Sequence, residues 1–134
     1  MANVVDYLAR VIDWASGRMK VDAQLTGSLT TDITFHEDAT VAADGTIFTI
    51  DGHKTLTVEI YGTSTSRTIE FKGRCVSGID RPIMGVRLSD LSTTISTTGT
   101  GEIWQFDITG LTSVLMDMSA IAGGNVTVKG KAVA

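Results

Sequence analysis

Short runs of alternating apolar and polar residues recur along most of this chain, and turns rich in glycine separate them about every ten residues. In one run Trp104, Phe106 and Ile108 alternate with Gln105 and Asp107. Because successive side chains of a strand point to opposite faces, this pattern predicts sheets with one buried and one solvated face. Comparable runs lie at 29–35, 46–50, 56–60, 68–71, 83–88, 114–118 and 126–133.

About eight short strands of this kind predict an all-β sandwich or barrel. We expect an antiparallel two-sheet sandwich, jelly-roll-like as the first choice and immunoglobulin-like as the second. The Gly123-Gly124-Asn125 turn is expected to join the last two strands as a hairpin. The length of 134 residues suits one domain with its own core.

The first residues follow a different pattern, which predicts one α-helix. Asn3 is a good N-cap, apolar residues then recur with a period near 3.6, and Gly17 suits a left-handed helix end. Asp6, Arg10 and Asp13 occupy the opposite side of this helix. We therefore expect an N-terminal helix at 1–17, an extended arm with the first strand at 18–38, and a β-sandwich domain at 39–134.

The apolar stripe of this helix must pack against something, because about 15 residues form only a marginal helix in isolation. It can pack on its own sandwich, or on a partner or a second copy of the chain. The second interpretation makes the helix an attachment element. The expected attachment residues are Val5, Leu8, Val11, Ile12 and Trp14.

Composition narrows the function classes. The net charge is −4 and the sequence pI is about 5.0, without a basic patch, which argues against nucleic-acid binding. The sequence shows neither a secretory signal nor an 18-residue apolar stretch, so we expect no membrane partner. The single cysteine, Cys75, is expected to be a buried structural thiol of a protein assembled inside a cell.

Metal and cofactor sites find little support in the sequence. His36, Glu37 and Asp38 are adjacent, but with His53 and Cys75 they match no compact zinc spacing, and a solvated turn is the better interpretation. The Asp-Gly pairs at 44–45 and 51–52 lack the remaining ligands of a calcium loop and are expected to be plain turns. The glycines at 99 and 101 complete no phosphate loop. We predict no metal and no cofactor.

Catalysis is not predicted either. The chain has no Gly-x-Ser-x-Gly elbow, and both histidines lie in turn-like segments, so we expect no catalytic residues and no enzyme. Trp104, Phe106 and Phe71 could form a sugar-stacking platform, but their phase favours the core. The Ser/Thr-rich loop at 90–101, above all residues 92–100, is the better candidate for an exposed contact surface.

The C-terminal third carries a resemblance to a known class of proteins. The sequence Trp104-Gln105-Phe106-Asp107-Ile108-Thr109-Gly110, followed by the runs at 114–118 and 123–130, is similar to small β-sandwich virion proteins of tailed bacteriophages. The sequence pattern of the segment 56–74 is also similar to that of these proteins. The resemblance covers about 80 residues and supplies no catalytic residue.

This resemblance implies a non-enzymatic virion structural protein. A head decoration or capsid-associated protein is the leading expectation, and a tail or receptor- or carbohydrate-binding sandwich module is the alternative. The implied partners are copies of the chain itself, with a trimer favoured, and virion proteins such as the major capsid protein. Carbohydrate remains a further candidate ligand. The implied location is the virion, assembled in the bacterial cytoplasm.

Overall fold

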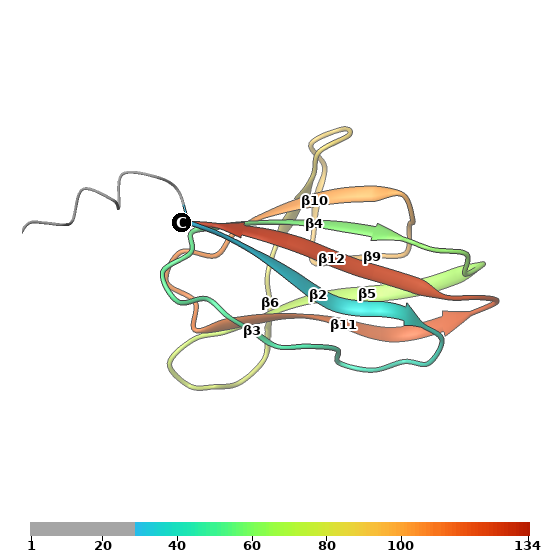
Figure 1. Ribbon diagram of the computed structural model, residues 1–134, viewed down its shortest axis with the longest axis horizontal. Helices are drawn as coiled ribbons and strands as arrows, with labels where there is room; N and C mark the ends of the chain where they lie inside the picture. The colour runs from blue at the N-terminus through green and yellow to red at the C-terminus, as the bar shows by residue number, and fades with distance from the viewer. Residues whose placement is uncertain (1–28) are drawn as a thin grey trace, which may run out of the picture.

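The computed structural model describes residues 29–134, which form two packed antiparallel β-sheets (Figure 1). The all-β class and the two-sheet architecture are therefore confirmed. The helix expected at 1–17 and most of the arm expected at 18–38 lie outside the described residues. Across the described range, no helix is long and apolar enough to cross a membrane.

One sheet has six strands and the order β2-β12-β4-β10-β7-β8. Its long strands are β2 (Thr30–Ala39), β12 (Val126–Val133), β4 (Thr55–Tyr61) and β10 (Glu102–Asp107), and two short strands, β7 (Gly85–Arg87) and β8 (Thr93–Thr94), complete it. The strand expected near 29–35 is thus β2, which pairs along its length with β12 and forms one edge of the sandwich.

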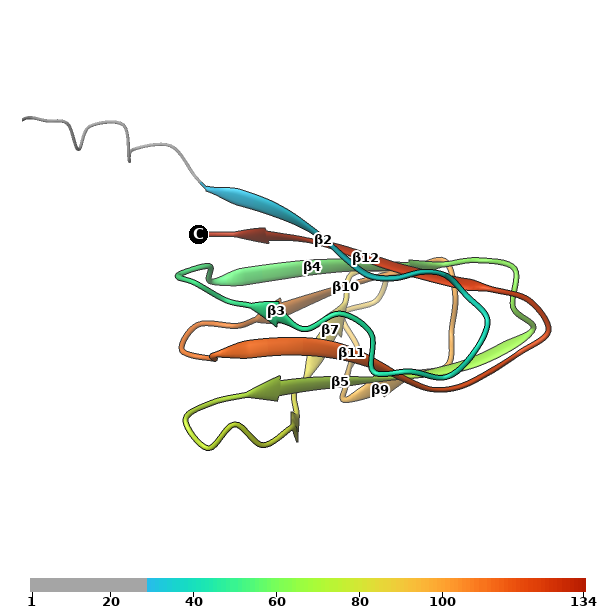
Figure 2. The ribbon, with the colours of Figure 1, turned by 60° about the horizontal axis from the view of Figure 1, so that its bottom comes forward.

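The other sheet has five strands and the order β3-β11-β5-β6, with β9 also paired to β5. The central pair is β11 (Ser113–Ala122) and β5 (Ser66–Arg74), flanked by β3 (Phe48–Thr49), β6 (Arg81–Pro82) and β9 (Ser96–Thr97). Figure 2 shows the two layers, with β2, β12 and β4 in one and β11 and β5 in the other.

The core fills the space between the layers, as the alternation predicted. On β4, Leu56, Val58 and Ile60 are buried, while Glu59 and Tyr61 are exposed. The inward residues of β5, β10, β11 and β12 face the same core. The hydrophobic effect of removing this continuous apolar surface from water is the main term that holds the two sheets together.

The expected hairpin between the last two strands is wrong. β11 and β12 each alternate correctly, but they belong to different sheets, so the turn at 123–125 carries the chain from one layer to the other. Gly123 and Gly124 have φ angles of 76° and 142°, which favour glycine. A Cβ on Gly123 would clash with Thr65 Oγ1, so glycine also allows the close contact with the β4–β5 turn.

Candidate functional site

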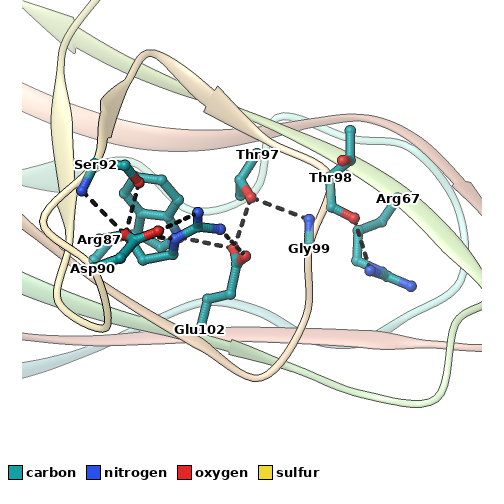
Figure 3. A network of polar contacts seen from close by, with 9 residues as sticks. Arg67, Arg87, Asp90, Ser92, Thr97, Thr98, Gly99 and Glu102 are labelled. Atoms are coloured by element: carbon teal, nitrogen blue, oxygen red, sulfur yellow. Dashed lines mark hydrogen bonds and ion pairs between the residues drawn. The ribbon is translucent and has the colours of Figure 1, made fainter.

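The segment from residue 88 to 101 leaves the six-stranded sheet after β8, pairs with β5 of the five-stranded sheet as β9, and returns to the six-stranded sheet at β10. A network of polar side chains holds this segment at both ends (Figure 3). Arg87, at the end of β7, forms a fork with Asp90: Nε donates to Oδ1 at 3.2 Å and Nη2 donates to Oδ2 at 2.9 Å. Ser92 donates from its backbone N–H and its hydroxyl to the same Asp90 Oδ1. This fixes a compact loop between β7 and β8.

Glu102, the first residue of β10, joins this loop to the core. Its Oε2 accepts from Arg87 Nη1 at 2.8 Å, and its Oε1 accepts from Thr97 Oγ1 at 2.7 Å and from Trp104 Nε1 at 3.0 Å. The guanidinium of Arg87 also lies 5.6 Å from the ring centroid of Trp104, a cation–π distance. One carboxylate therefore ties together two sheets and the loop between them.

Arg67 holds the other end of the crossing segment. It is the second residue of β5 and only 7% exposed. Its guanidinium donates to Ser64 Oγ, to the Ser64 carbonyl and to the Thr98 carbonyl, at 2.7, 2.6 and 2.9 Å. Among the described residues no carboxylate forms a salt bridge with it, and its hydrogen bonds go to backbone and hydroxyl oxygens. Arg67 thus clamps the loop at 98 onto the turn that precedes β5.

The network keeps its acids and bases charged. Hydrogen bonds from Arg87 and Ser92 hold the pKa of Asp90 well below its usual range. Burial works to raise the pKa of Glu102, but hydrogen bonds from Thr97, Trp104 and Arg87 outweigh it and lower that pKa. The hydrogen bonds from Arg87 to Asp90 and Glu102 in turn raise the arginine pKa. The ion pairs and hydrogen bonds of the network thus favour the charged forms of Arg87, Asp90 and Glu102.

The lowered pKa of Glu102 gives a pH prediction. A carboxyl whose pKa is lower in the folded protein contributes stability that is present above its unfolded pKa, about 4.3 for Glu. This contribution disappears as the pH falls through the folded pKa. We therefore expect the free energy of unfolding to fall below about pH 4.5, and to fall less steeply in the Glu102→Gln variant.

Urea unfolding between pH 7 and pH 2.5 measures this difference. The matched control is Glu59→Gln, which neutralises an exposed carboxylate on the outer face of the same sheet and should follow the wild-type slope. Parallel slopes for wild type and Glu102→Gln would contradict the stabilising role assigned to the Glu102 charge.

The outer face of the six-stranded sheet carries an open groove of about 450 Å³, lined by residues of β2, β4, β10 and β12. Ile103 of β10 lies opposite Glu59 of β4, which in turn lies opposite Lys129 of β12. Lys131, one row along, forms a 3.4 Å ion pair with Asp32 of β2. The groove therefore presents an apolar side chain at one side and charges of both signs along its length.

The expected solvated turn at His36 is wrong. His36 lies in β2, is buried, and its Nε2 is 2.6 Å from the Met116 carbonyl of β11, which implies a proton on Nε2. The residue links the two sheets. Register shifts in the β2–β12 pairing mark bulges near this point, and Asp38 has a φ of 49°. A bulge puts consecutive residues out of strict alternation, which is why Phe35 and His36 are both buried.

The other candidate ligands do not gather around a metal. His53 is close to the Ile50 carbonyl and Thr31 Oγ1 through its two ring nitrogens. No group of three or more His, Cys, Asp or Glu side chains in residues 29–134 could hold a metal ion. The Asp51-Gly52 pair forms a tight turn, with positive φ at both residues and a hydrogen bond from His53 N to the Ile50 carbonyl.

Cys75 was expected to be buried, and this prediction is wrong, because the thiol is exposed. β5 ends at Arg74, so Cys75 is the first residue of the following loop and no longer alternates into the core. Its nearest polar partner is the Gly110 carbonyl, 3.7 Å from Sγ.

The aromatic residues confirm the core interpretation. Phe71, Trp104 and Phe106 are buried, and the ring centroid of Phe71 lies 5.1 Å from that of Trp104 and 4.8 Å from that of Phe106. The Ser/Thr-rich segment at 90–101 contains the exposed loop tip but also the buried Thr97. Sequence reasoning missed Arg67, Arg87 and Glu102. The only sequence feature that could have indicated them was the position of two charged residues beside apolar runs. Arg67 takes an inward position in its strand, and Glu102 begins its strand.

The chain resembles known proteins of phage elements. The XepA family matches residues 29–132. The "Phage-like element PBSX protein XepA" of Bacillus subtilis is 43% identical over 117 residues, which cover 87% of this chain and 40% of that protein. The "Uncharacterized protein YqxG" of the same organism is 36% identical, over 87% of this chain and 42% of that protein. The chain thus spans about two-fifths of the length of both relatives.

A shorter relative matches over most of its length. The "SPbeta prophage-derived uncharacterized protein YomS" of B. subtilis is 40% identical over 75% of this chain and 84% of that protein. Its crystal structure superimposes with a TM-score of 0.77, covering 81% of this chain and 96% of the YomS chain. The crystal structure of the "PBSX exported protein XepA" gives a TM-score of 0.80 over 88% of this chain and 41% of that one.

Proposed function

The chain belongs to the XepA family, and we propose that it is a non-enzymatic structural protein of a phage particle, a head decoration or capsid-associated protein that works by binding. The observation that carries this proposal is the match to XepA and YomS, two proteins of phage elements, over the whole sandwich. In YomS this unit makes up most of the protein, which supports the view that the sandwich is a self-contained module.

The chemistry of the sandwich supports a binding role. Arg67, Arg87, Asp90 and Glu102 are engaged in hydrogen bonds that fix loops and join the two sheets. Such a network holds a surface in one shape, and a preorganised surface binds with less loss of conformational entropy.

Attachment is proposed to come from the N-terminal residues Val5, Leu8, Val11, Ile12 and Trp14, which lie outside the described residues. Burial of apolar area contributes about 25 cal/mol per Å². On a symmetric shell, repeated contacts add avidity. The proposed partners are further copies of the chain, as a trimer, and the major capsid protein.

We expect the double variant Leu8→Asp/Ile12→Asp to lose binding to particles while its sandwich stays folded, because charges cannot be buried in an apolar contact without a large desolvation cost. The assay is rebinding of purified full-length protein to particles from a phage element whose gene for this chain has been deleted. Circular dichroism and thermal unfolding report on the sandwich.

The matched control is Arg10→Asp, which introduces a carboxylate on the opposite side of the predicted helix and should keep binding. Light scattering should give a discrete oligomer for wild type and a smaller species for the double variant. Loss of the β-fold in Leu8→Asp/Ile12→Asp would instead place these residues in the core of the sandwich and contradict the attachment role.

A carbohydrate- or receptor-binding module is the second candidate, and the groove on the six-stranded sheet favours it. Thr57, Glu59, Lys129 and Asp32 offer hydrogen-bond donors and acceptors around it. A glycan array tests this candidate, and a signal lost in the Lys129→Ala variant would support it. The absence of binding to every glycan on the array would count against this candidate.

A further inference from the structure

The open groove on the outer face of the six-stranded sheet extends between two aliphatic side chains, Val133 of β12 and Ile103 of β10. The strand β4 lies between β12 and β10, and in the register of the sheet Val133 lies opposite Thr55 while Ile103 lies opposite Glu59. With strands about 4.8 Å apart and residues about 3.4 Å apart along each strand, the two side chains are separated by about 17 Å. The groove is therefore an elongated surface, diagonal to the strands.

Several polar side chains that line the groove are already paired within the sheet. Thr57 Oγ1 accepts from Gln105 Nε2 at 3.4 Å, and Lys131 forms an ion pair with Asp32 at 3.4 Å. A segment that covers the groove would leave Thr57 its hydrogen bond, while the surface of Ile103, which is 44% exposed, would be removed from water. An apolar helix face packs on such aliphatic groups better than a sugar does, because the hydroxyls of a sugar need polar partners.

The described chain begins at one end of this groove. The Leu29 carbonyl accepts from the Ala134 N–H at 2.9 Å, and Thr30 pairs with Val133. β2 therefore starts beside the end of β12 (Figure 1). Residues 1–28 precede this point and lie outside the described residues. An arm at 18–28 can span up to about 36 Å when extended, so the helix predicted at 1–17 can reach the whole groove.

The apolar stripe of the predicted helix matches the groove in length and in chemistry. An α-helix rises about 1.5 Å per residue, so the stripe from Val4 to Ala15 is about 16 Å long. Leu8 and Ile12 occupy its middle. Asp6 is on the opposite side of the predicted helix and would stay in water when the stripe is covered.

We propose that the N-terminal segment of this chain packs its apolar stripe into the groove of its own sandwich in the free protein. The inference rests on the proposed function and adds a regulation to it: the stripe that attaches the chain to the particle is covered until the particle competes for it. Docking lowers the apparent affinity for the particle by the fraction of molecules whose stripe is free. It also keeps an apolar surface, which would favour aggregation, out of water.

Amide hydrogen exchange of the full-length chain tests the docking. A free helix of about 15 residues is marginal, so amides at 4–16 exchange slowly only when the segment is packed. We expect exchange in wild type to be slower by about tenfold or more than in Ile103→Lys or in Val133→Lys, each of which places a charge at one end of the groove. Thermal unfolding shows whether the sandwich of each variant stays folded.

The matched control is Ile95→Lys, because Ile95 is 46% exposed and lies beside β5 of the other sheet. This variant should keep the wild-type exchange at 4–16. Ile103→Lys should also bind particles that lack this chain more tightly than wild type does. The gain in affinity should equal the factor by which exchange at 4–16 is accelerated, since both report the same docking equilibrium.

The outcomes separate this inference from the proposed function. Wild-type amides at 4–16 that exchange as fast as those of Ile103→Lys would overturn the docking, whether or not the chain binds particles. Slow exchange that both groove variants retain would also overturn it, because the stripe would then be covered elsewhere. Slow exchange that is lost on dilution would assign the stripe to a second copy instead. Wild type with the expected exchange but no binding to particles would overturn the proposed function alone.

Discussion

Replacement of Trp104 by alanine is expected to lower the free energy of unfolding by about 3–5 kcal/mol. The indole is buried between the layers and packs against Phe71, with ring centroids 5.1 Å apart. The substitution leaves a large cavity. It also removes the donor to Glu102 Oε1 and the ring beneath Arg87. Packing and the polar network are therefore lost together.

Equilibrium urea unfolding of the full chain measures this effect. Ile103→Ala, at the neighbouring exposed position of the same strand, is the matched control and should cost much less. Equal losses in the two variants would mean that Trp104 is not at the centre of the core.

Arg67→Met is expected to cost about 3 kcal/mol, because it leaves two buried oxygens of Ser64 without their donors, and each unsatisfied buried group costs about 1–3 kcal/mol. It also removes the donor to the partly buried Thr98 carbonyl. Methionine fills similar space, so the loss reports on hydrogen bonds more than on a cavity. Arg67→Lys should recover only part of the loss, because a lysine cannot reproduce the planar fork that reaches three acceptors.

Unfolding free energies and amide hydrogen exchange check this prediction. Exchange should accelerate at residues 97–101, which Arg67 clamps, and remain unchanged at the opposite end of the sheets. Arg81→Met, which removes an exposed arginine from β6, is the control and should be nearly neutral. A neutral Arg67→Met variant would show that the clamp contributes nothing to stability.

Alternation in the sequence was enough to predict most strands and the core, because burial of one face imposes a period of two. It could not assign strands to sheets: β11 and β12 carry the right pattern, yet the turn between them crosses layers. Bulges and strand ends also broke the rule. His36 is buried beside a bulge, and Cys75 is exposed one residue past the end of β5.

The polar network was beyond sequence reasoning for a different reason. Arg87 and Glu102 are 15 residues apart, and Arg67 and Thr98 are 31 apart, so only the folded topology brings them together. Their residue types fit ordinary surface positions equally well.

Quantitative mass spectrometry of purified particles from the phage element that encodes this chain asks whether this member of the XepA family is a structural part of a phage particle. We expect the protein in a fixed ratio to the major capsid protein, retained after a high-salt wash because apolar contacts are not screened by salt. A protein that is absent from the particles, or that leaves them in that wash, would contradict the structural role proposed for it.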